Sequence, residues 1–316
     1  MIRDCCLGID TSCYTASVAC VADNSIVFSE RTMLSVPFGE RGLRQSEALF
    51  QQIRLLTPLI EHLFQKIDRN RIGAVCVSSK PTSATDSYMP VFLAGLQTAR
   101  NIAAALGVPL IETDHQCGHL RAALVGNEDL IGKEFYGFHL SGGTTDLVRV
   151  NCTRKQPYEI RPIGTSLDLH CGQFVDRIGV ALGLPFPTGK HMESLAVQAN
   201  NRNVKFSSSV KNGNCSFSGP ESSAMRSINV LEREEVAFGV YDCISRTIEK
   251  MLKGAEKRYG HLPILLCGGV ASSILLRELL NQRIGGGLRF GKSELSSDNA
   301  VGVAFIGLER RQSWKN

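Results

Sequence analysis

The pattern of apolar and polar residues along the chain predicts alternating strands and helices. An apolar run, a polar turn at residues 10–15 and a second apolar run predict a β-hairpin at 5–21. Further along, short apolar runs alternate with segments whose apolar residues recur every three or four positions. These predict strand 25–29, helix 47–65, strand 73–78, helix 93–106 and strand 108–111. The apolar stripe expected on the first helix consists of Leu49, Ile53, Leu56, Leu59, Ile60 and Leu63.

The second half of the chain begins with the same theme. Residues 137–150 again read as a strand, a tight turn and a returning strand. Two hairpins of this kind in corresponding positions suggest a duplicated α/β fold. The pattern further predicts a helix at 169–182, a Pro/Gly-rich turn at 183–190 and a helix at 232–258. A strand at 263–267 is followed by a double-glycine turn and a helix to 283. A loop at 285–287 and a final helix to 311 complete the predicted elements.

Composition narrows the class of protein. The chain has 316 residues, 43% of them hydrophobic, and a formal net charge of +5, which permits a polyanionic partner without requiring one. The chain has 11 cysteines, an odd number that cannot all pair in disulfides, and none has Cys-x-x-Cys spacing. This favours buried thiols in a reducing compartment over a disulfide framework. No signal peptide or membrane-length apolar run is present, so we expect a soluble, cytoplasmic protein with no membrane partner.

Two histidines provide the first candidate chemistry. His115 and His119 follow the strand at 108–111 and are four residues apart, so a helix beginning at 114 places both on one face. Two imidazoles in this arrangement can bind a divalent transition metal, with a carboxylate as the natural third ligand. The spacing alone is equally compatible with surface or helix-capping histidines.

The turns of the two hairpins are candidate phosphate sites. The first contains Asp10 and Ser12, which offer a carboxylate and a hydroxyl and which we consider as catalytic candidates. The second is Ser141-Gly142-Gly143-Thr144, whose glycines allow close approach of the backbone to a ligand. Both turns are also compatible with a purely structural role, because they consist of good turn formers.

Taken in order, these motifs resemble the tRNA threonylcarbamoyladenosine transferase (TsaD) family, once called O-sialoglycoprotein endopeptidases. The resemblance extends from Leu7 to about Leu308. It implies the actin-like/sugar-kinase fold, a duplicated ribonuclease-H-like α/β fold with two lobes and an interlobe nucleotide cleft. On this basis we expect lobe I at 1–113, completed by 293–316, and lobe II at 114–292.

The resemblance also assigns roles to individual residues. It implies that His115, His119 and Asp298 bind one metal ion, iron or zinc, although Asp298 is also a candidate helix cap. The residues implied to bind substrate or nucleotide are Leu140, Ser141, Gly142, Gly143, Thr144, Asp176, Gly189, Gly268, Gly269 and Ser273, the last in place of an asparagine of the family. From its position alone, Asp176 is equally compatible with a place on a solvated helix face and with a hydrogen bond to a ribose or base.

The family reaction, by resemblance, moves a threonylcarbamoyl group from its adenylate to adenosine 37 of tRNA. The implied cofactors are the divalent metal and an adenine nucleotide, ATP or threonylcarbamoyl-AMP. The implied partners are tRNA and a related protein of the same fold. The family's old label of metalloprotease is disfavoured, because a zincin needs a glutamate directly after the first histidine and this chain has Gln116 there.

Several residues depart from the family pattern. In the first turn, Tyr14 and Thr15 replace an aspartate and a glutamate, and Thr144 replaces the histidine of the second turn. These differences leave two hypotheses: an active transferase, or a non-catalytic paralog that binds nucleotide and metal and acts as a scaffold or regulator.

Overall fold

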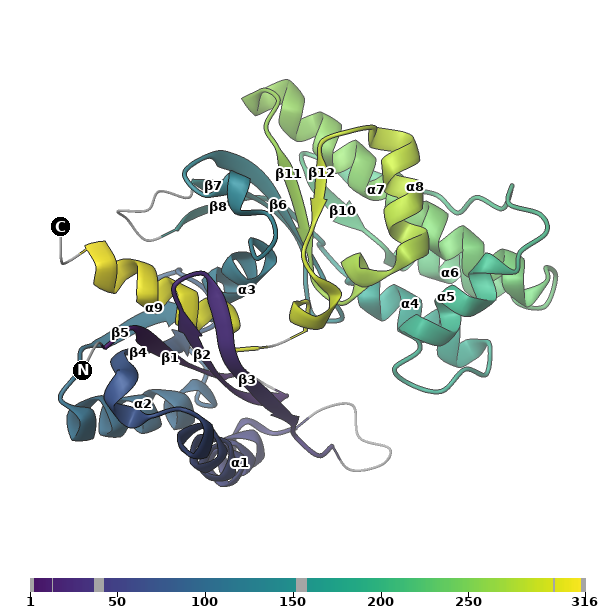
Figure 1. Ribbon diagram of the computed structural model, residues 1–316. Coiled ribbons are helices and arrows are strands. Elements are labelled where there is room, and N and C mark those ends of the chain that lie inside the picture. The colour runs from purple at the N-terminus through teal and green to yellow at the C-terminus, as the bar shows by residue number, and fades with distance from the viewer. Residues whose placement is uncertain (1–2, 13, 37–42, 152–157, 298, 314–316) are drawn as a thin grey trace. The chain divides into compact units, whose positions relative to one another are not determined.

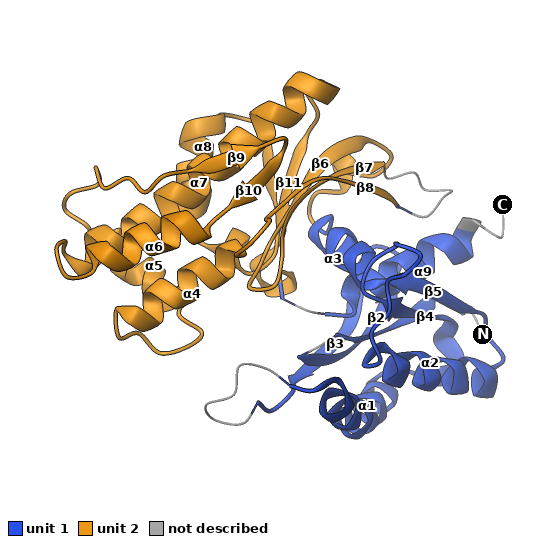
Figure 2. Ribbon diagram, turned by 180° about the vertical axis from the view of Figure 1, so that it is seen from behind, with its two compact units in different colours: residues 1–125, 153–158, 297–316 blue, residues 126–152, 159–296 orange. Residues whose placement is uncertain are grey.

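The computed structural model divides the chain into two compact units (Figures 1 and 2). It describes residues 3–12, 14–36, 43–151, 158–297 and 299–313. Unit 1 comprises Met1–Val125, Thr153–Tyr158 and Ser297–Asn316, and unit 2 comprises Gly126–Cys152 and Glu159–Ser296. The sequence led us to expect the first boundary at 113/114, whereas the contacts place it at 125/126, so the segment with both histidines belongs to unit 1.

Unit 1 is built on a mixed sheet. In the described part of the chain its strand order is β3-β2-β1-β4-β5. The strands are β1 (Cys5–Thr11), β2 (Thr15–Ala22), β3 (Ser25–Met33), β4 (Ile72–Lys80) and β5 (Leu110–Asp114). The predicted hairpin is confirmed, since β1 pairs with β2 antiparallel in a register that joins Asp10 to Ser17. On its other side β1 pairs with β4 in parallel, and β4 pairs with β5 in parallel.

Helices cover both faces of this sheet (Figure 1). α1 (Gln45–Lys66) and α2 (Phe92–Leu106) lie on one face, and α3 (His115–Ala123) and α9 (Val301–Ser313) lie on the other. Two glycines allow α9 to approach closely. A Cβ atom at Gly8 of β1 would lie 2.6 Å from Ala300 O, and one at Gly302 would lie 1.9 Å from Gly118 O in α3.

The buried stripe of α1 differs from the predicted one. The helix buries Ala48, Gln52, Leu56, Leu59 and Leu63, a series with helical spacing. Ile53, which we expected on this stripe, is 56% exposed, and the exposed surface of α1 also carries Phe50. The correction follows from geometry: position 53 is about 100° around the helix from position 52, so only one of the two can face the sheet.

Unit 2 repeats the topology of unit 1. Its strand order, β12-β11-β6-β7-β8, corresponds to that of unit 1 with β6 in the place of β1. The strands are β6 (Glu134–Leu140), β7 (Thr145–Asn151), β8 (Glu159–Thr165), β11 (Ile264–Cys267) and β12 (Leu288–Phe290), with a small separate pair, β9 (Ser209–Lys211) and β10 (Asn214–Ser216). The pairings β6–β7 and β7–β8 are antiparallel, and β6–β11 and β11–β12 are parallel. The duplication expected from the two hairpins is therefore present in the strand order.

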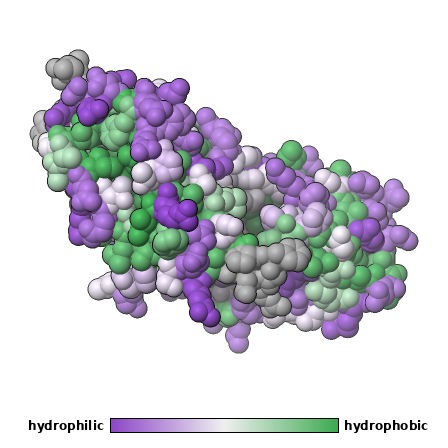
Figure 3. Space-filling view, turned by 90° about the horizontal axis from the view of Figure 1, so that it is seen from below, coloured by the Kyte–Doolittle hydropathy of each residue, from purple (hydrophilic) through white to green (hydrophobic). Residues whose placement is uncertain are grey.

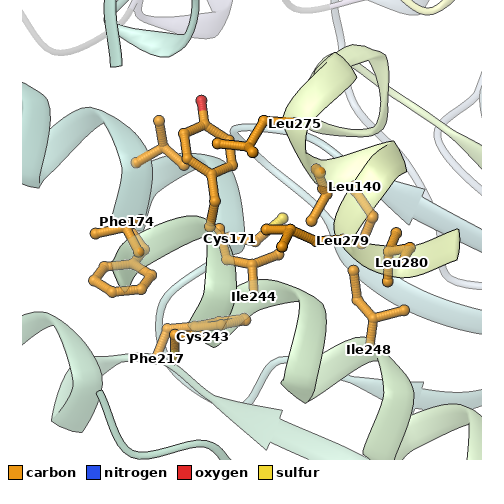
Figure 4. Packing of buried hydrophobic residues seen from close by; sticks show 14 of the residues in the cluster. Leu140, Cys171, Phe174, Phe217, Cys243, Ile244, Ile248, Leu275, Leu279 and Leu280 are labelled. Carbon is orange, nitrogen blue, oxygen red and sulfur yellow. The ribbon is translucent and has the colours of Figure 1, made fainter. Parts of the chain in front are cut away.

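The helices of unit 2 enclose its hydrophobic core. They are α4 (Cys171–Ala181), α5 (Gly189–Val197), α6 (Ser218–Ser227), α7 (Arg233–Tyr259) and α8 (Ile274–Ile284). Leucines of α8 pack against Ile244 and Ile248 of α7 and against Leu140 at the end of β6 (Figure 4). Because Leu140 belongs to this core, the core fixes the end of β6 at the point where the second hairpin turn begins.

The elements of unit 2 that the sequence led us to miss include β8, α5 and β12. β8 has three exposed residues, one of them Pro162, as suits an edge strand, and therefore lacks a clear apolar pattern. α5 begins inside the Pro/Gly-rich segment 183–190, which we expected to be a turn throughout. β12 contains only three residues and comes directly after the glycines at 285–287.

The surface is mixed in polarity, with hydrophobic residues interspersed among hydrophilic ones on the face shown in Figure 3. None of the helices that the structure describes is long and apolar enough to cross a membrane. Nine cysteines lie in the described ranges, and all nine are buried free thiols.

Candidate functional site

The two histidines lie at the start of α3. Asp114, the last residue of β5, accepts a hydrogen bond from Cys117 N at 2.8 Å and so caps the helix without an intervening loop. His115 and His119 are the first and fifth residues of α3 and project from one face, as the spacing predicts. His119 is 7% exposed.

The two imidazole rings converge on one another. Their Nε2 atoms are 3.0 Å apart, and the ring planes are inclined at 76° with centroids 4.4 Å apart. Two nitrogen ligands of one tetrahedral zinc ion lie about 3.3 Å apart, given bonds of about 2.0–2.1 Å. The separation of the two Nε2 atoms therefore fits two ligands of a single ion with little adjustment.

A carboxylate from β1 contacts the first histidine. Asp10 Oδ1 is 2.8 Å from His115 Nδ1 and also accepts a hydrogen bond from Ser78 Oγ at 2.5 Å. Asp10 is 0% exposed. Its second oxygen, Oδ2, is buried and has no hydrogen-bond partner among the residues that the structure describes. A buried carboxylate satisfied on one oxygen only is costly unless positive charge lies nearby, so this environment suits a cation on the histidine pair.

The donor set fits iron or zinc, since imidazole nitrogens with carboxylate oxygen are suitable ligands for both. In the described part of the chain no three histidine, cysteine or acidic side chains form a metal-binding group. The third ligand implied by the resemblance, Asp298, lies outside the described residues. Its neighbour Asn299 accepts a hydrogen bond from Val301 N at 3.0 Å, so Asn299 supplies a cap at the start of α9.

The first hairpin turn is held by Gln52 of α1. The fully buried Gln52 donates from Nε2 to Ser12 O at 2.7 Å and to Thr15 O at 2.9 Å, which joins the two sides of the turn. Ser12 and Thr15 are buried, at 4% and 6% exposed, whereas Tyr14 is 42% exposed. The two positions at which family acids are replaced therefore differ: one side chain is enclosed and the other reaches the surface.

The second hairpin turn is open to solvent. Ser141 N donates to Thr144 O at 2.8 Å and closes the turn, while Gly142 and Gly143 are exposed. A Cβ atom on either glycine would meet no atom within 4 Å, so the space above the turn is empty. Beneath it, Gly172 N at the start of α4 donates to Ser141 O. The turn therefore combines a fixed base with an accessible backbone, as an anion site requires.

Asp176 of α4 fixes the start of α5. Its Oδ1 accepts hydrogen bonds from Thr188 N at 2.8 Å and from Thr188 Oγ1 at 3.1 Å. Gly189 follows directly, and its carbonyl accepts a hydrogen bond from Tyr241 OH at 3.0 Å. A Cβ atom at Gly189 would meet no atom within 4 Å. Asp176 therefore has a structural partner on one oxygen and lies next to an open glycine.

The double-glycine turn lies beside the second hairpin turn. Gly268 has φ +97°, and a Cβ there would lie 2.3 Å from Leu140 O, so this position requires glycine. Gly269 is exposed with open space around it. Ser273 caps α8 by accepting from Leu276 N at 3.1 Å and donates to Glu193 Oε1 at 2.9 Å. Both of these hydrogen bonds of the Ser273 hydroxyl are made with other residues of the protein.

Asp168, which lies three residues before α4, binds the start of α6. It accepts hydrogen bonds from Phe217 N, Ser218 N and Ser218 Oγ. Burial opposes the ionisation of Asp168, but these hydrogen bonds and that of Leu169 N outweigh it and lower the pKa of the carboxyl. Asp168 is therefore a structural carboxylate that connects two helices.

Three residues that contact the candidate site were missed in the sequence. Ser78 is the last buried residue of the parallel strand β4, and a polar residue near this end of a strand is a signal that could have identified it. Gln52 lies in an amphipathic helix, where a glutamine normally faces solvent. Glu193 lies in a helix that was itself unexpected.

Comparison with known proteins decides the family. The sequence model of TsaD, described as tRNA N6-adenosine threonylcarbamoyltransferase, matches residues 33–305. The chain belongs to this family. Proteins of that name from Neorickettsia sennetsu and Carboxydothermus hydrogenoformans are 25% and 28% identical to it. The two alignments cover 96% and 98% of this chain, and each covers 93% of the relative. The resemblance stated from the motifs is thereby confirmed.

Solved structures confirm the fold class. HypF of T. kodakarensis superposes with a TM-score of 0.62 at 13% identity, covering 99% of this chain and 49% of HypF. Component A of the (R)-2-hydroxyglutaryl-CoA dehydratase of Acidaminococcus fermentans gives 0.57 at 13% identity, and a ROK family glucokinase from Streptomyces griseus gives 0.55 at 10% identity, each covering 98% of this chain and 99% of the other. This TsaD family member therefore has the actin-like/sugar-kinase α/β fold.

Proposed function

We propose that this TsaD family member transfers a threonylcarbamoyl group from its adenylate to adenosine 37 of tRNA with the help of a bound metal ion. The observation that carries the proposal is the convergence of His115 Nε2 and His119 Nε2 at 3.0 Å beside the buried carboxylate of Asp10. The family match supports the transfer of a threonylcarbamoyl group to an adenosine of tRNA.

In this proposal His115, His119 and Asp298 hold iron or zinc, which when bound supplies Lewis-acid stabilisation of developing negative charge. The protein's own groups orient the substrates. The backbone of Ser141–Thr144, with Leu140 before it, accommodates the phosphate of the adenine nucleotide, ATP or threonylcarbamoyl-AMP. Support comes from the open space above Gly142 and Gly143.

The remaining residues of unit 2 would border the nucleoside. Gly189 and Gly269 are open positions where a ribose or base can approach the backbone. Asp176 offers its second carboxylate oxygen, and Gly268 keeps the turn close to Leu140. Ser273, already bonded to Glu193, would act by holding this region rather than by direct contact. On unit 1, Ser12 would contribute through the turn that it shares with Asp10.

The proposed partners follow from the reaction. tRNA is the acceptor, and the net charge of +5 is compatible with a polyanion. A related protein of the same fold is the second partner that we propose, as the resemblance of the motifs implies.

The proposal is tested by expressing the chain in a bacterial strain that lacks its own TsaD enzyme. We expect threonylcarbamoyladenosine to reappear in hydrolysed tRNA, measured by liquid chromatography with mass spectrometry. His115→Ala and His119→Ala should each reduce the modified nucleoside at least tenfold and lower the bound iron or zinc. His261→Ala serves as the matched control, because His261 is 89% exposed and lies in unit 2, so it should behave like the wild type.

A second function is favoured by one observation. Tyr14 and Thr15 stand where the family has acids, and Thr15 is enclosed at 6% exposed. A non-catalytic paralog that binds nucleotide and metal would tolerate this loss. The same assay separates the two: wild-type protein that retains metal but leaves tRNA unmodified would contradict the transferase and support the scaffold.

A further inference from the structure

The contact between Asp10 and His115 joins residues that are distant in sequence. Asp10 lies near the end of β1, and its backbone carbonyl accepts a hydrogen bond from Ser17 Oγ on β2 at 3.2 Å. The carboxylate is therefore anchored in the middle of a sheet. Its Oδ1 meets His115 Nδ1 at 2.8 Å. Such a contact between a fixed acceptor and one ring nitrogen determines which way the ring faces.

We propose that Asp10 is a positioning residue that fixes the ring orientation and tautomer of His115 and thereby sets the metal affinity of the histidine pair. The inference rests on the proposed function only for the identity of the site as a metal centre. The carboxylate accepts a hydrogen bond from Nδ1–H, so the proton stays on Nδ1 and the lone pair is on Nε2, the atom that faces His119 Nε2. Asp10 then acts through His115 and need not touch substrate.

The packing around the imidazole supports this assignment. The ring of Phe92 lies edge-on to the ring of His115, with centroids 5.9 Å apart. Ser78 Oγ donates to the same Asp10 oxygen from the neighbouring strand β4, so the acceptor itself is held from a second side. His115 is thus held by a carboxylate at Nδ1 and by an aromatic edge along its ring.

The second oxygen of Asp10 provides an independent observation. Oδ2 is buried and has no hydrogen-bond partner within the described ranges. If the carboxylate served only to anchor α3 to the sheet, a neutral amide would satisfy the same contact without a buried charge. A carboxylate here is explained by a positive charge carried on the far side of the imidazole. In this arrangement, a carboxylate that contacts the histidine but not the metal increases the basicity of the metal-bound imidazole.

The tautomer can be measured in the metal-free full-length protein, independently of any activity. We would label histidines with ¹⁵N, assign His115 by its absence in His115→Gln, and record the ring nitrogen shifts at pH 8. The proposal requires wild-type His115 to carry its proton on Nδ1. In Asp10→Asn the ring nitrogen shifts should move toward those of a mixture of the two tautomers, because an amide can accept from Nδ1–H through its oxygen or donate to Nδ1 through its nitrogen. A wild-type ring protonated on Nε2 would overturn the proposal, and this measurement needs no variant of Asp10 to fold.

Metal affinity provides the second readout. In zinc titrations against a competing chelator, Asp10→Asn should bind zinc 10- to 100-fold more weakly than the wild type. The matched control is Asp23→Asn, the same change of charge in the exposed turn between β2 and β3, at a residue with φ +52° that asparagine also tolerates. Ser78→Ala removes the other hydrogen bond to Oδ1 and should weaken binding less than Asp10→Asn does.

The outcomes separate the two proposals. Equal zinc affinity of folded Asp10→Asn and wild type, checked by circular dichroism, would defeat the role of Asp10 while leaving the transferase proposal intact. A wild type that binds neither zinc nor iron would defeat the metal centre instead, and the ¹⁵N spectrum would still decide whether Asp10 orients His115.

Discussion

The side-chain amide of Gln52 donates two hydrogen bonds to backbone carbonyls of the turn that follows Asp10, those of Ser12 and Thr15. This contact depends on folding, because 37 and 40 residues separate Gln52 from its acceptors. At this scale the sequence selected Asp10, His115 and His119 as candidates from their residue types and spacing, and their roles stay predictions. It could not pair Asp10 with His115, since the two are 105 positions apart in the sequence and only the parallel sheet brings them together.

Gln52→Leu should loosen the first turn while the helix persists. Leucine has a similar volume but leaves the carbonyls of Ser12 and Thr15 without their donor, which costs about 1–3 kcal/mol. Equilibrium unfolding in urea measures the loss. Gln65→Leu, at an exposed position of the same helix, should change the free energy of unfolding by less than about 0.5 kcal/mol. Equal effects of the two substitutions would show that Gln52 does not hold the turn.

At the scale of elements, the second hairpin turn depends on the helix behind it. α4 begins at Cys171, whose N–H donates to Thr145 Oγ1 at 2.8 Å, and Gly172 lies against the turn itself. The hairpins and long helices were predictable because their hydrophobic period is clear over many residues. β8, α5 and β12 were not predictable from such a period. An edge strand, a helix next to a Pro/Gly-rich segment and a three-residue strand form because of the elements packed against them in the fold.

Gly172→Ala should displace the turn of residues 141–144. The added Cβ would lie 2.6 Å from Ser141 O and from Gly142 N, and backbone atoms cannot rotate away. We expect a loss of about 1–3 kcal/mol in the free energy of unfolding. Weaker binding of a fluorescent adenine nucleotide should accompany it.

Gly254→Ala provides the matched control. Gly254 is an exposed residue inside α7, and its Cβ would meet no atom within 4 Å. Alanine should therefore stabilise the protein by about 0.5–1 kcal/mol. If both alanines stabilise the protein equally, the contact between Gly172 and the turn has no energetic significance.

At the scale of the whole molecule, both units bury cysteine thiols in their cores. Burial raises the pKa of Cys76 in unit 1 and of Cys171 and Cys267 in unit 2 to about 12 each, from an ordinary value of 9.0. Composition alone suggested buried thiols, and the nine described cysteines are all buried. The metal-binding role of Asp298 stays a prediction, because Asp298 lies outside the described residues and the sequence alone does not reveal which side chains it contacts.

These thiols predict a loss of stability at high pH. Each folded-state pKa is raised, so the stabilisation is complete below pH 9 and is lost between pH 9 and about 12, as the unfolded chain releases protons that the folded chain retains. Each thiol then contributes a decrease of up to about 1.4 kcal/mol per pH unit. Urea unfolding at pH 8, 9 and 10 measures the slope. Cys267→Ala should give a shallower slope than the wild type, and identical slopes would contradict the assignment.

The position of α9 has a consequence for how the protein is made. This last helix lies against β1, β2 and β4, and Gly302 and Gly307 of α9 contact α3 and the sheet with almost no intervening space. Synthesis on the ribosome proceeds from the N-terminus, so every strand of unit 1 emerges long before the helix that covers it. Unit 2 ends at Ser296 and has all its strands earlier. The nascent chain therefore completes its second unit first, and the apolar face of the first unit stays uncovered until α9 has been synthesised.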